Sequence, residues 1–496
     1  MWAGRVTAIS ILPDDVLLHI FHFDRVTYFE DVDRMIDARV IQFPRTSESD
    51  TRDTRLWHLP WGWCRLTHVC QRWRSVVFAS PNFLDLKLVF GPRTRVELAD
   101  IWPPLPIILR NGFSFVMPRG YDFDAVIVHH NRVCEINLHH LSSSQLLRLT
   151  SAMQDQFPAL IHLMLDYDGY YDHPAPAPPD GFSAPRLQSL TLRNIPFPAL
   201  PKLLLSATDL VDLTLVGIPQ TGYFTPVALV TGLTVSANLK SLTIDFKSPL
   251  SRPDQKSRRP PPTTRFVLPA LTYFHFHGVS EYLEDVVARI DAPLLCSIVI
   301  TFFNQLIFDT PQLAQFMRRA TRFQAFDNSE VWVEFYSSYV QIRSSSWARS
   351  FYDGPDGFKL TILSTKLDWQ LSSLTPVLTS FLPSTDMVEQ LYIIGPRPRP
   401  LPSQWLDDIE DVQWLDIFYP FPAVKNLYVC KEFAQCITFA LKELVVERVT
   451  EVFPALETLF LEELQPSGPV QEAIGKFVTA RELLGHSVAV SQWNKK

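Results

Sequence analysis

The hexapeptide LQSLTL, Leu187–Leu192, is one copy of a pattern that returns along most of this chain. Its first, fourth and sixth residues are leucine, and every other copy is apolar at the same three positions. The copies are LIHLML at 160, LQSLTL at 187, LVDLTL at 210, LKSLTI at 239, LTYFHF at 271, LCSIVI at 295, VEQLYI at 388, VKNLYV at 424 and LETLFL at 456. Within the two runs, neighbours begin 23 to 36 residues apart (210 minus 187 is 23, 424 minus 388 is 36), which is the spacing of solenoid repeats.

Each copy predicts a short strand that buries its apolar positions and points the others outward. Proline marks the approach to most of these strands, two residues before the first apolar position. These prolines are Pro158, Pro185, Pro269, Pro293, Pro422 and Pro454. Because proline cannot continue a helix and biases its predecessor to extended geometry, each is expected to separate a preceding helix from the strand.

The pattern resembles the leucine-rich repeat, L-x-x-L-x-L-x-x-N, over roughly two thirds of the chain. The resemblance implies an α/β solenoid. The ninth position departs from the family's asparagine, so irregular turns are expected; it holds Ile195, Ile218, Lys247, Glu432 and Leu464. Between Leu295 and Val388 the pattern weakens, which indicates either degenerate repeats with paired strands or a small inserted β element. A helix within 469–485 is expected to cap the array.

The N-terminal part carries two amphipathic helical stretches. In GWCRLTHVCQRWRSVVFASPNF, Gly62–Phe83, apolar residues recur at the three-and-four spacing of a helix. In ISILPDDVLLHIF, Ile9–Phe21, Pro13 suits the first helical turn, and the two aspartates that follow favour the positive end of the helix dipole. Both stretches are therefore predicted to be helices with one apolar face.

Together these stretches resemble the F-box, the helical module that docks substrate receptors onto the adaptor of SCF-type cullin–RING ubiquitin ligases. The resemblance is carried by Leu12-Pro13, Ile20-Phe21 and Val69-Cys70 with Trp73, and it implies adaptor docking by Leu12, Pro13, Ile20, Phe21, Val69 and Trp73. Phe83 stands where the motif commonly ends in tryptophan, and an insert over about 24–60 leaves open whether the two halves close into one module. An ordinary surface helix is the alternative for the second stretch.

The expected organisation is an all-helical F-box over 1–90, a junction with the first strands over 91–159, and an irregular leucine-rich-repeat-like array over 160–496. The family resemblance implies the substrate-recognition subunit of an SCF-type E3 ligase, which contacts the adaptor, and through it the cullin, and binds a protein substrate. It is not expected to be an enzyme, because other subunits carry the transfer chemistry. Two alternatives stay open: a repeat scaffold that works without a ligase, and an enzyme with an unrecognised site in 323–369.

Composition narrows the class of partner. The 496 residues are 47% hydrophobic and 20% charged, as in a globular protein, and the net charge of −7 argues against a nucleic-acid binder. No run of about 18 apolar residues is found, and the start lacks a signal-peptide core, so no membrane association is expected. We expect an intracellular protein, cytoplasmic or nuclear, whose six cysteines are buried thiols.

No phosphate-binding, nucleophile-elbow or zinc-ligand motif is present, so no cofactor and no metal are expected. His129, His130, His139 and His140 with Cys134 fit no familiar metal spacing. His275 and His277 share a strand face, where exposed histidines are the simpler interpretation.

The fifth residue of each copy points away from the core, and along the array it changes from threonine to aromatic side chains. The sequence predicts substrate contact through His275, Tyr392, Tyr428 and Phe460. The alternative is that the C-terminal helix or a neighbouring loop covers these aromatic residues.

Overall fold

A computed structural model describes residues 12–23, 64–90, 104–111, 127–168, 175–253, 264–305, 308–320, 330–344, 357–381, 387–395, 411–444, 450–463 and 467–493. The chain divides into two compact units, Met1–Ile195 and Pro196–Lys496, which we call unit 1 and unit 2. This division follows contacts within the chain, whereas the sequence boundaries after 90 and 159 follow motif content. The insert predicted over 24–60 lies outside the described residues.

Unit 1 contains helices followed by a parallel sheet. A helix over 14–23 comes first, then α2 (Cys64–Thr67) and α3 (Gln71–Ala79). The strands are β1 (Leu88–Phe90), β2 (Ile107–Arg110), β3 (Val133–Leu141), β4 (His162–Tyr167) and β5 (Ser189–Arg193), with α6 (Ser143–Ala152) between β3 and β4. They lie in chain order, and each pairs in parallel with the next.

Unit 2 alternates strands with helices. Its main-sheet strands are β6 (Asp212–Ile218), β7 (Ser241–Phe246), β9 (Tyr273–Gly278), β11 (Ser297–Phe302), β12 (Glu330–Tyr336), β13 (Tyr339–Ser344), β14 (Gly357–Leu363), β15 (Gln390–Ile394), β16 (Asn426–Val429), β17 (Thr458–Leu461) and β18 (Ala489–Gln492). Its helices are α7 (Leu200–Ser206), α8 (Pro226–Leu233), α9 (Ser280–Val287), α10 (Pro311–Arg319), α13 (Leu367–Phe381), α15 (Asp411–Phe418), α16 (Ala434–Glu443) and α17 (Pro469–Leu483). A short pair, β8 (Phe266–Val267) and β10 (Ile290–Asp291), lies outside the main sheet.

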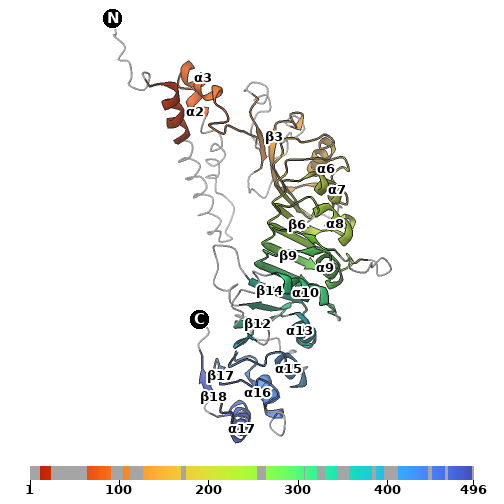
Figure 1. Cartoon of the computed structure of the whole chain (residues 1–496), viewed down its shortest axis with the longest axis vertical. Helices are drawn as coiled ribbons and strands as arrows, with labels where there is room; N and C mark the ends of the chain where they lie inside the picture. Colours follow the sequence, from red (N-terminus) through yellow and green to blue (C-terminus); the bar gives the residue numbers. More distant parts are fainter. Residues whose placement is uncertain are drawn as a thin grey trace. The chain divides into compact units, whose positions relative to one another are not determined.

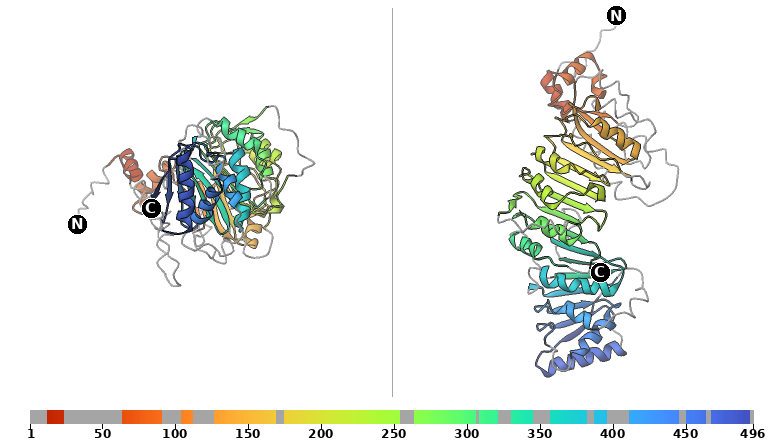
Figure 2. Two further views of the ribbon diagram at one scale, coloured as in Figure 1. Left: turned by 90° about the horizontal axis from the view of Figure 1, so that it is seen from below. Right: turned by 90° about the vertical axis from the view of Figure 1, so that its right-hand side faces the viewer.

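Helices line one face of the unit 2 sheet, and each packs against the next along the chain (Figures 1 and 2). The opposite face, which we call the open face, carries none of the described helices of unit 2. This strand–helix alternation is the α/β, solenoid-like architecture that the repeat pattern predicts. Within the described residues, no helix combines the length and apolar character needed to cross a membrane.

All nine copies of the pattern form strands, and their apolar positions are buried. In the copy at 239, for example, Leu239, Leu242 and Ile244 are each 0% exposed. The prolines have a more specific place than the sequence indicates, because each stands second in a tight turn that leads into the strand. At Pro185, the Leu187 N–H donates to the Ala184 carbonyl at 3.1 Å, and proline is favoured at this turn position.

The weak segment between 295 and 388 belongs to the same sheet. β12 and β13 form an antiparallel hairpin, and β13 also pairs antiparallel with β14. β14 pairs in parallel with β11, and β12 pairs in parallel with β15. Of the two alternatives left by the sequence, paired strands within the array describe this segment.

In two of the repeats, a buried isoleucine fills the ninth position where the family has asparagine. Ile195 and Ile218 are only 3% and 4% exposed. The strand pairing of β6 with β7 shifts register between Leu215 and Ile218, and Gly217 there has a φ of 66°. The expected irregularity of the turns is therefore present here, whereas Leu464 lies outside the described residues.

A buried carboxylate joins two neighbouring helices of unit 2. α10 begins at Pro311, and the backbone N–H groups of its first turn have no intrahelical acceptor because no helical turn precedes them. Glu284 of α9 accepts from two of them, at 2.9 Å from Gln312 N and 2.8 Å from Leu313 N. The Glu284 carboxylate therefore caps the N-terminus of α10 and lies at the positive end of that helix's dipole.

Replacing Glu284 by Ala is expected to lower the free energy of unfolding of unit 2 by about 2 to 4 kcal/mol, because two buried donors lose a charged acceptor. Glu281→Ala on the same helix is the matched control, since its side chain is 31% exposed. Thermal and urea unfolding followed by circular dichroism would measure both. Equal stability of the two variants would contradict the capping role.

Candidate functional sites: an N-terminal helix pair and an aromatic ladder

The helix over 14–23 and α3 pack against each other, and we call them the N-terminal helix pair. The rings of Phe21 and Trp73 lie 4.7 Å apart between their centroids. At the start of the first helix, Asp14 accepts hydrogen bonds from two nitrogens of Arg72 at 3.0 and 2.7 Å. The two sequence stretches thus close on each other, which answers the question raised by the long insert between them.

The six residues predicted to dock an adaptor divide between the surface and the contact between the helices. Ile20 is 42% exposed, Val69 is 58% exposed and Pro13 is also exposed. Phe21 is 1% exposed, so it builds the contact with the half-buried Trp73. Leu12 is half-buried.

Two apolar side chains outside the motif positions, Val16 and Phe23, are exposed on the first helix, and Phe83 at the end of the second stretch is exposed as well. Phe83 lies against the rings of His19 and His22, with centroids 5.5 and 5.3 Å away. Helical spacing from Ile20 would have found Val16, one turn earlier on the same side.

Cys70 is exposed and is the N-cap residue immediately before α3, which corrects the expectation of buried thiols at this position. Its sulfur accepts from the Trp73 N–H at 3.5 Å and caps the helix. Cys134 and Cys430 are buried as expected, and burial raises the pKa of the Cys430 thiol to about 12. Cys430 is therefore protonated and suited to packing rather than to nucleophilic chemistry.

On the open face of unit 2, four aromatic rings from neighbouring strands stack into what we call the aromatic ladder. Its members are Trp332, Tyr392, Tyr428 and Phe460, on β12, β15, β16 and β17. Successive ring centroids lie 4.1, 4.2 and 4.4 Å apart, with interplanar angles of 9°, 8° and 6°. The strand register creates this stack, since each residue is paired directly with the next.

The ladder ends on a charged group. The Arg343 guanidinium lies 4.5 Å from the centre of the Trp332 ring and donates to Glu334 at 2.9 Å. Glu334 is only 8% exposed and also accepts from Gln341 and from the Tyr336 hydroxyl. Burial and the nearby Glu334 carboxylate raise the pKa of Tyr336, so the phenol stays protonated as a donor.

The two middle rings of the ladder, Tyr392 and Tyr428, contact Trp493, which follows β18. Its ring stands at 76° to Tyr428 and 68° to Tyr392, with centroids 5.6 and 6.1 Å away. Its indole N–H donates to the Val429 carbonyl at 3.1 Å. The ladder is therefore half-buried, and Trp493, which follows the strand β18 rather than belonging to the C-terminal helix, covers part of it.

Three of the four predicted substrate-contact residues come together in the ladder, and His275 does not. Along the register, Val299, Lys359 and Arg343 stand between His275 and Trp332. Burial lowers the pKa of His275, so this half-buried imidazole is neutral near pH 7. Sequence analysis missed Trp332, although its alternation with buried valines in EVWVEFY places it on the open face.

The histidines singled out by sequence make other contacts. His277 pairs with Asp245 at 2.9 Å and lies 4.6 Å from the Phe303 ring centroid. His130 Nδ1 lies 2.7 Å from the Gln156 carbonyl oxygen. Among the residues that the structure describes, no group of three or more His, Cys, Asp and Glu side chains is placed to hold a metal ion.

No protein-family model matches this sequence, and no curated protein matches it either. Among solved structures, the chain is similar to the leucine-rich repeat-containing protein LegL7 from Legionella pneumophila. The identity is 11% and the TM-score 0.26, over 79% of this chain and 96% of that chain. At this identity and TM-score, the likeness says nothing about function.

The difference in burial predicts that alanine substitutions within one motif have very different effects on the stability of the helix pair. Phe21→Ala should destabilise the packing of the pair by about 3 kcal/mol, because it removes a buried ring. Ile20→Ala and Val69→Ala should change it by less than about 0.5 kcal/mol, because both side chains are exposed. Hydrogen exchange of the α3 amides in the full chain would separate the two classes, and equal protection in all three variants would contradict the assignment.

The stacking predicts a structural contribution from the ladder. Tyr428→Ala removes two stacked contacts and should lower the free energy of unfolding of unit 2 by about 1 to 3 kcal/mol. Thr214→Ala, at the equivalent register position on β6, is the control and should have little effect. Thermal unfolding measures both, and an unchanged melting temperature for Tyr428→Ala would show that the stack does not stabilise unit 2.

Proposed function

We propose that this chain is the substrate-recognition subunit of an SCF-type cullin–RING ubiquitin ligase. The observation that carries the proposal is the N-terminal helix pair, which closes across the insert and leaves Ile20 and Val69 on its surface. Both are positions at which the F-box resemblance implies adaptor contact. The repeats would bind the substrate protein, and ubiquitin transfer would be carried out by other subunits.

The energetics of the helix pair support this assignment. An exposed aliphatic side chain gains roughly 25 cal/mol per Å² when a partner covers it. Ile20 and Val69, with Val16 and Phe23, expose apolar surface on a small module whose buried ring is Phe21. Binding energy at such surfaces concentrates in a few apolar anchors, and these residues have the exposure that anchors need before binding.

The aromatic ladder supports the second half of the proposal. It places half-buried aromatic rings on the open face, next to the largely buried Arg343–Glu334 pair. Aromatic and arginine side chains are enriched among interface anchors, and repeat arrays offer such extended surfaces to protein partners. A non-ligase scaffold is the second candidate, because the ladder needs no adaptor in order to bind a protein.

The proposal predicts that the purified full chain binds the SCF adaptor, and that Ile20→Asp with Val69→Asp weakens this binding at least about a hundredfold, since each buried charge would face an apolar pocket. Isothermal titration calorimetry with the purified adaptor measures the change. Leu147→Asp on α6 is the control, because Leu147 is 56% exposed and Val69 is 58% exposed.

The outcomes separate the two candidates. Adaptor binding that survives Leu147→Asp and is lost in the helix-pair variant supports the ligase receptor. If the folded wild-type chain does not bind the adaptor, the ligase assignment is wrong and the scaffold remains.

A further inference from the structure

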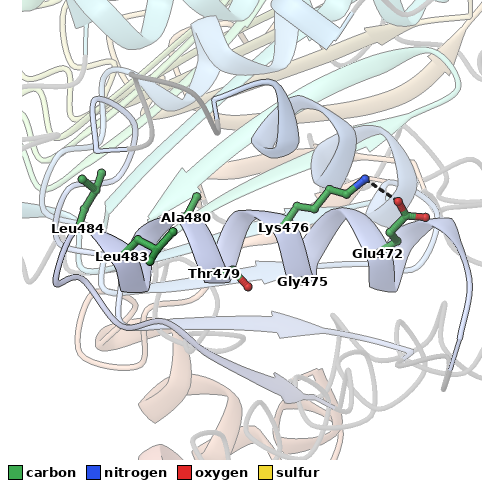
Figure 3. A pocket seen from close by; sticks show the side chains of 7 residues that line it. All are labelled: Glu472, Gly475, Lys476, Thr479, Ala480, Leu483 and Leu484. Atoms are coloured by element: carbon green, nitrogen blue, oxygen red, sulfur yellow. Dashed lines mark hydrogen bonds and ion pairs between the residues drawn. The ribbon is translucent and has the colours of Figure 1, made fainter.

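The outer side of α17 is apolar at one end and charged at the other. Leu483 is 83% exposed and Leu484 is 58% exposed at the C-terminal end. Lys476 and Glu472 form an ion pair of 2.5 Å at the N-terminal end, as Figure 3 shows. Between them lies a shallow depression lined by these side chains together with Gly475, Thr479 and Ala480.

The inner side of the same helix is also apolar, so α17 is not an ordinary surface helix. Ala473, Ile474 and Phe477 are at most 2% exposed, and α17 packs on α16 through this side. In the view from below in Figure 2, α17 lies in front of the other described elements of unit 2. Two neighbouring leucines that are this exposed, on the side of the helix opposite the core, are typical of a surface that binds another protein.

We propose that α17 pairs in antiparallel orientation with α17 of a second copy of this chain, around a two-fold axis at Thr479. In such a contact, residues equally far from Thr479 in opposite directions face each other. Gly475 then faces Leu483 of the other copy, and Lys476 faces Glu482, each pair occurring twice. The proposal does not depend on the ligase assignment.

The sizes of these side chains fit each other. A Cβ added at Gly475 would meet nothing within 4 Å, so the helix surface is open at this position. Leu483, about two turns away along the same side, is the most exposed leucine in the described chain. In the antiparallel pair, each leucine fills the space above the other copy's glycine, which is the knob-into-hole relation of packed helices.

The charges fit as well, and they favour a second copy over an unrelated partner. Lys476 and Glu482 are both exposed and lie three residues from Thr479 on opposite sides. Two-fold pairing therefore sets each lysine beside a glutamate of the other chain, whereas parallel pairing would set like charges together. A single helix on each side gives a contact smaller than the standard interface, so the dimer should form only at high protein concentration.

Sedimentation velocity of the full chain, from low micromolar to several hundred micromolar, tests the proposal. The wild type should shift from monomer to dimer, and Leu483→Lys should raise the apparent dissociation constant at least about tenfold. Leu205→Lys on α7 is the control, because Leu205 is also an exposed helix leucine, at 47%. Circular dichroism and melting temperature should be the same for all variants.

Charge reversal distinguishes this geometry from any other. Lys476→Glu alone and Glu482→Lys alone should each weaken the dimer, because each places two like pairs at the axis. An equimolar mixture of the two variants should dimerise again, since both cross-pairs are then of opposite charge. A wild type that is monomeric throughout, a dimer unaffected by Leu483→Lys, or a mixture that does not associate would each overturn the proposal.

Discussion

The backbone register between parallel strands is the constraint on which the array depends. Hydrogen bonds in a parallel ladder place each residue beside its equivalent in the next repeat, so residues of one motif position form a row across the sheet. On the helix side the row is aliphatic and closes the core. On the open face no helix covers the row, so its side chains contact one another. In the C-terminal part of the sheet these contacts are the stacked rings of Trp332, Tyr392, Tyr428 and Phe460. The ladder is therefore a property of the register as much as of the four residues.

Most of the array could be predicted because its signal is periodic. Leu187, Leu190 and Leu192 recur as a set, and a strand that buries alternate positions is the simplest structure that explains the set. The segment between β11 and β15 could not be placed in this way. Its alternation identifies strands, but local alternation is the same for parallel and antiparallel neighbours, and pairing partners depend on the rest of the sheet. For the same reason, the alternation around Trp332 indicates a strand but does not identify Trp332 as a member of the ladder.

The N-terminal helix pair shows a different limit. Periodicity finds the apolar side of each helix, and this side includes both Ile20 and Phe21. Which of the two is covered depends on how the second helix crosses the first, and the contact of Phe21 with Trp73 settles it. Motif comparison selects residues shared by a family, whether they pack or bind, so a list of motif residues mixes both roles. Val16 and Phe23, which are exposed here, belong to no motif position, so motif comparison does not select them.

The number of strands inserted between β11 and β15 decides the direction of every repeat that follows. β11 and β15 run in the same direction, yet the strands between them alternate in direction from β14 through β13 to β12. An odd number of such strands restores the original direction, whereas an even number would reverse every later repeat and turn its helices to the other face. Strands can therefore enter or leave this part of the chain only in pairs. Repeat arrays of this type can thus gain a complete β-hairpin in a single evolutionary step, while the repeats on both sides keep their orientation.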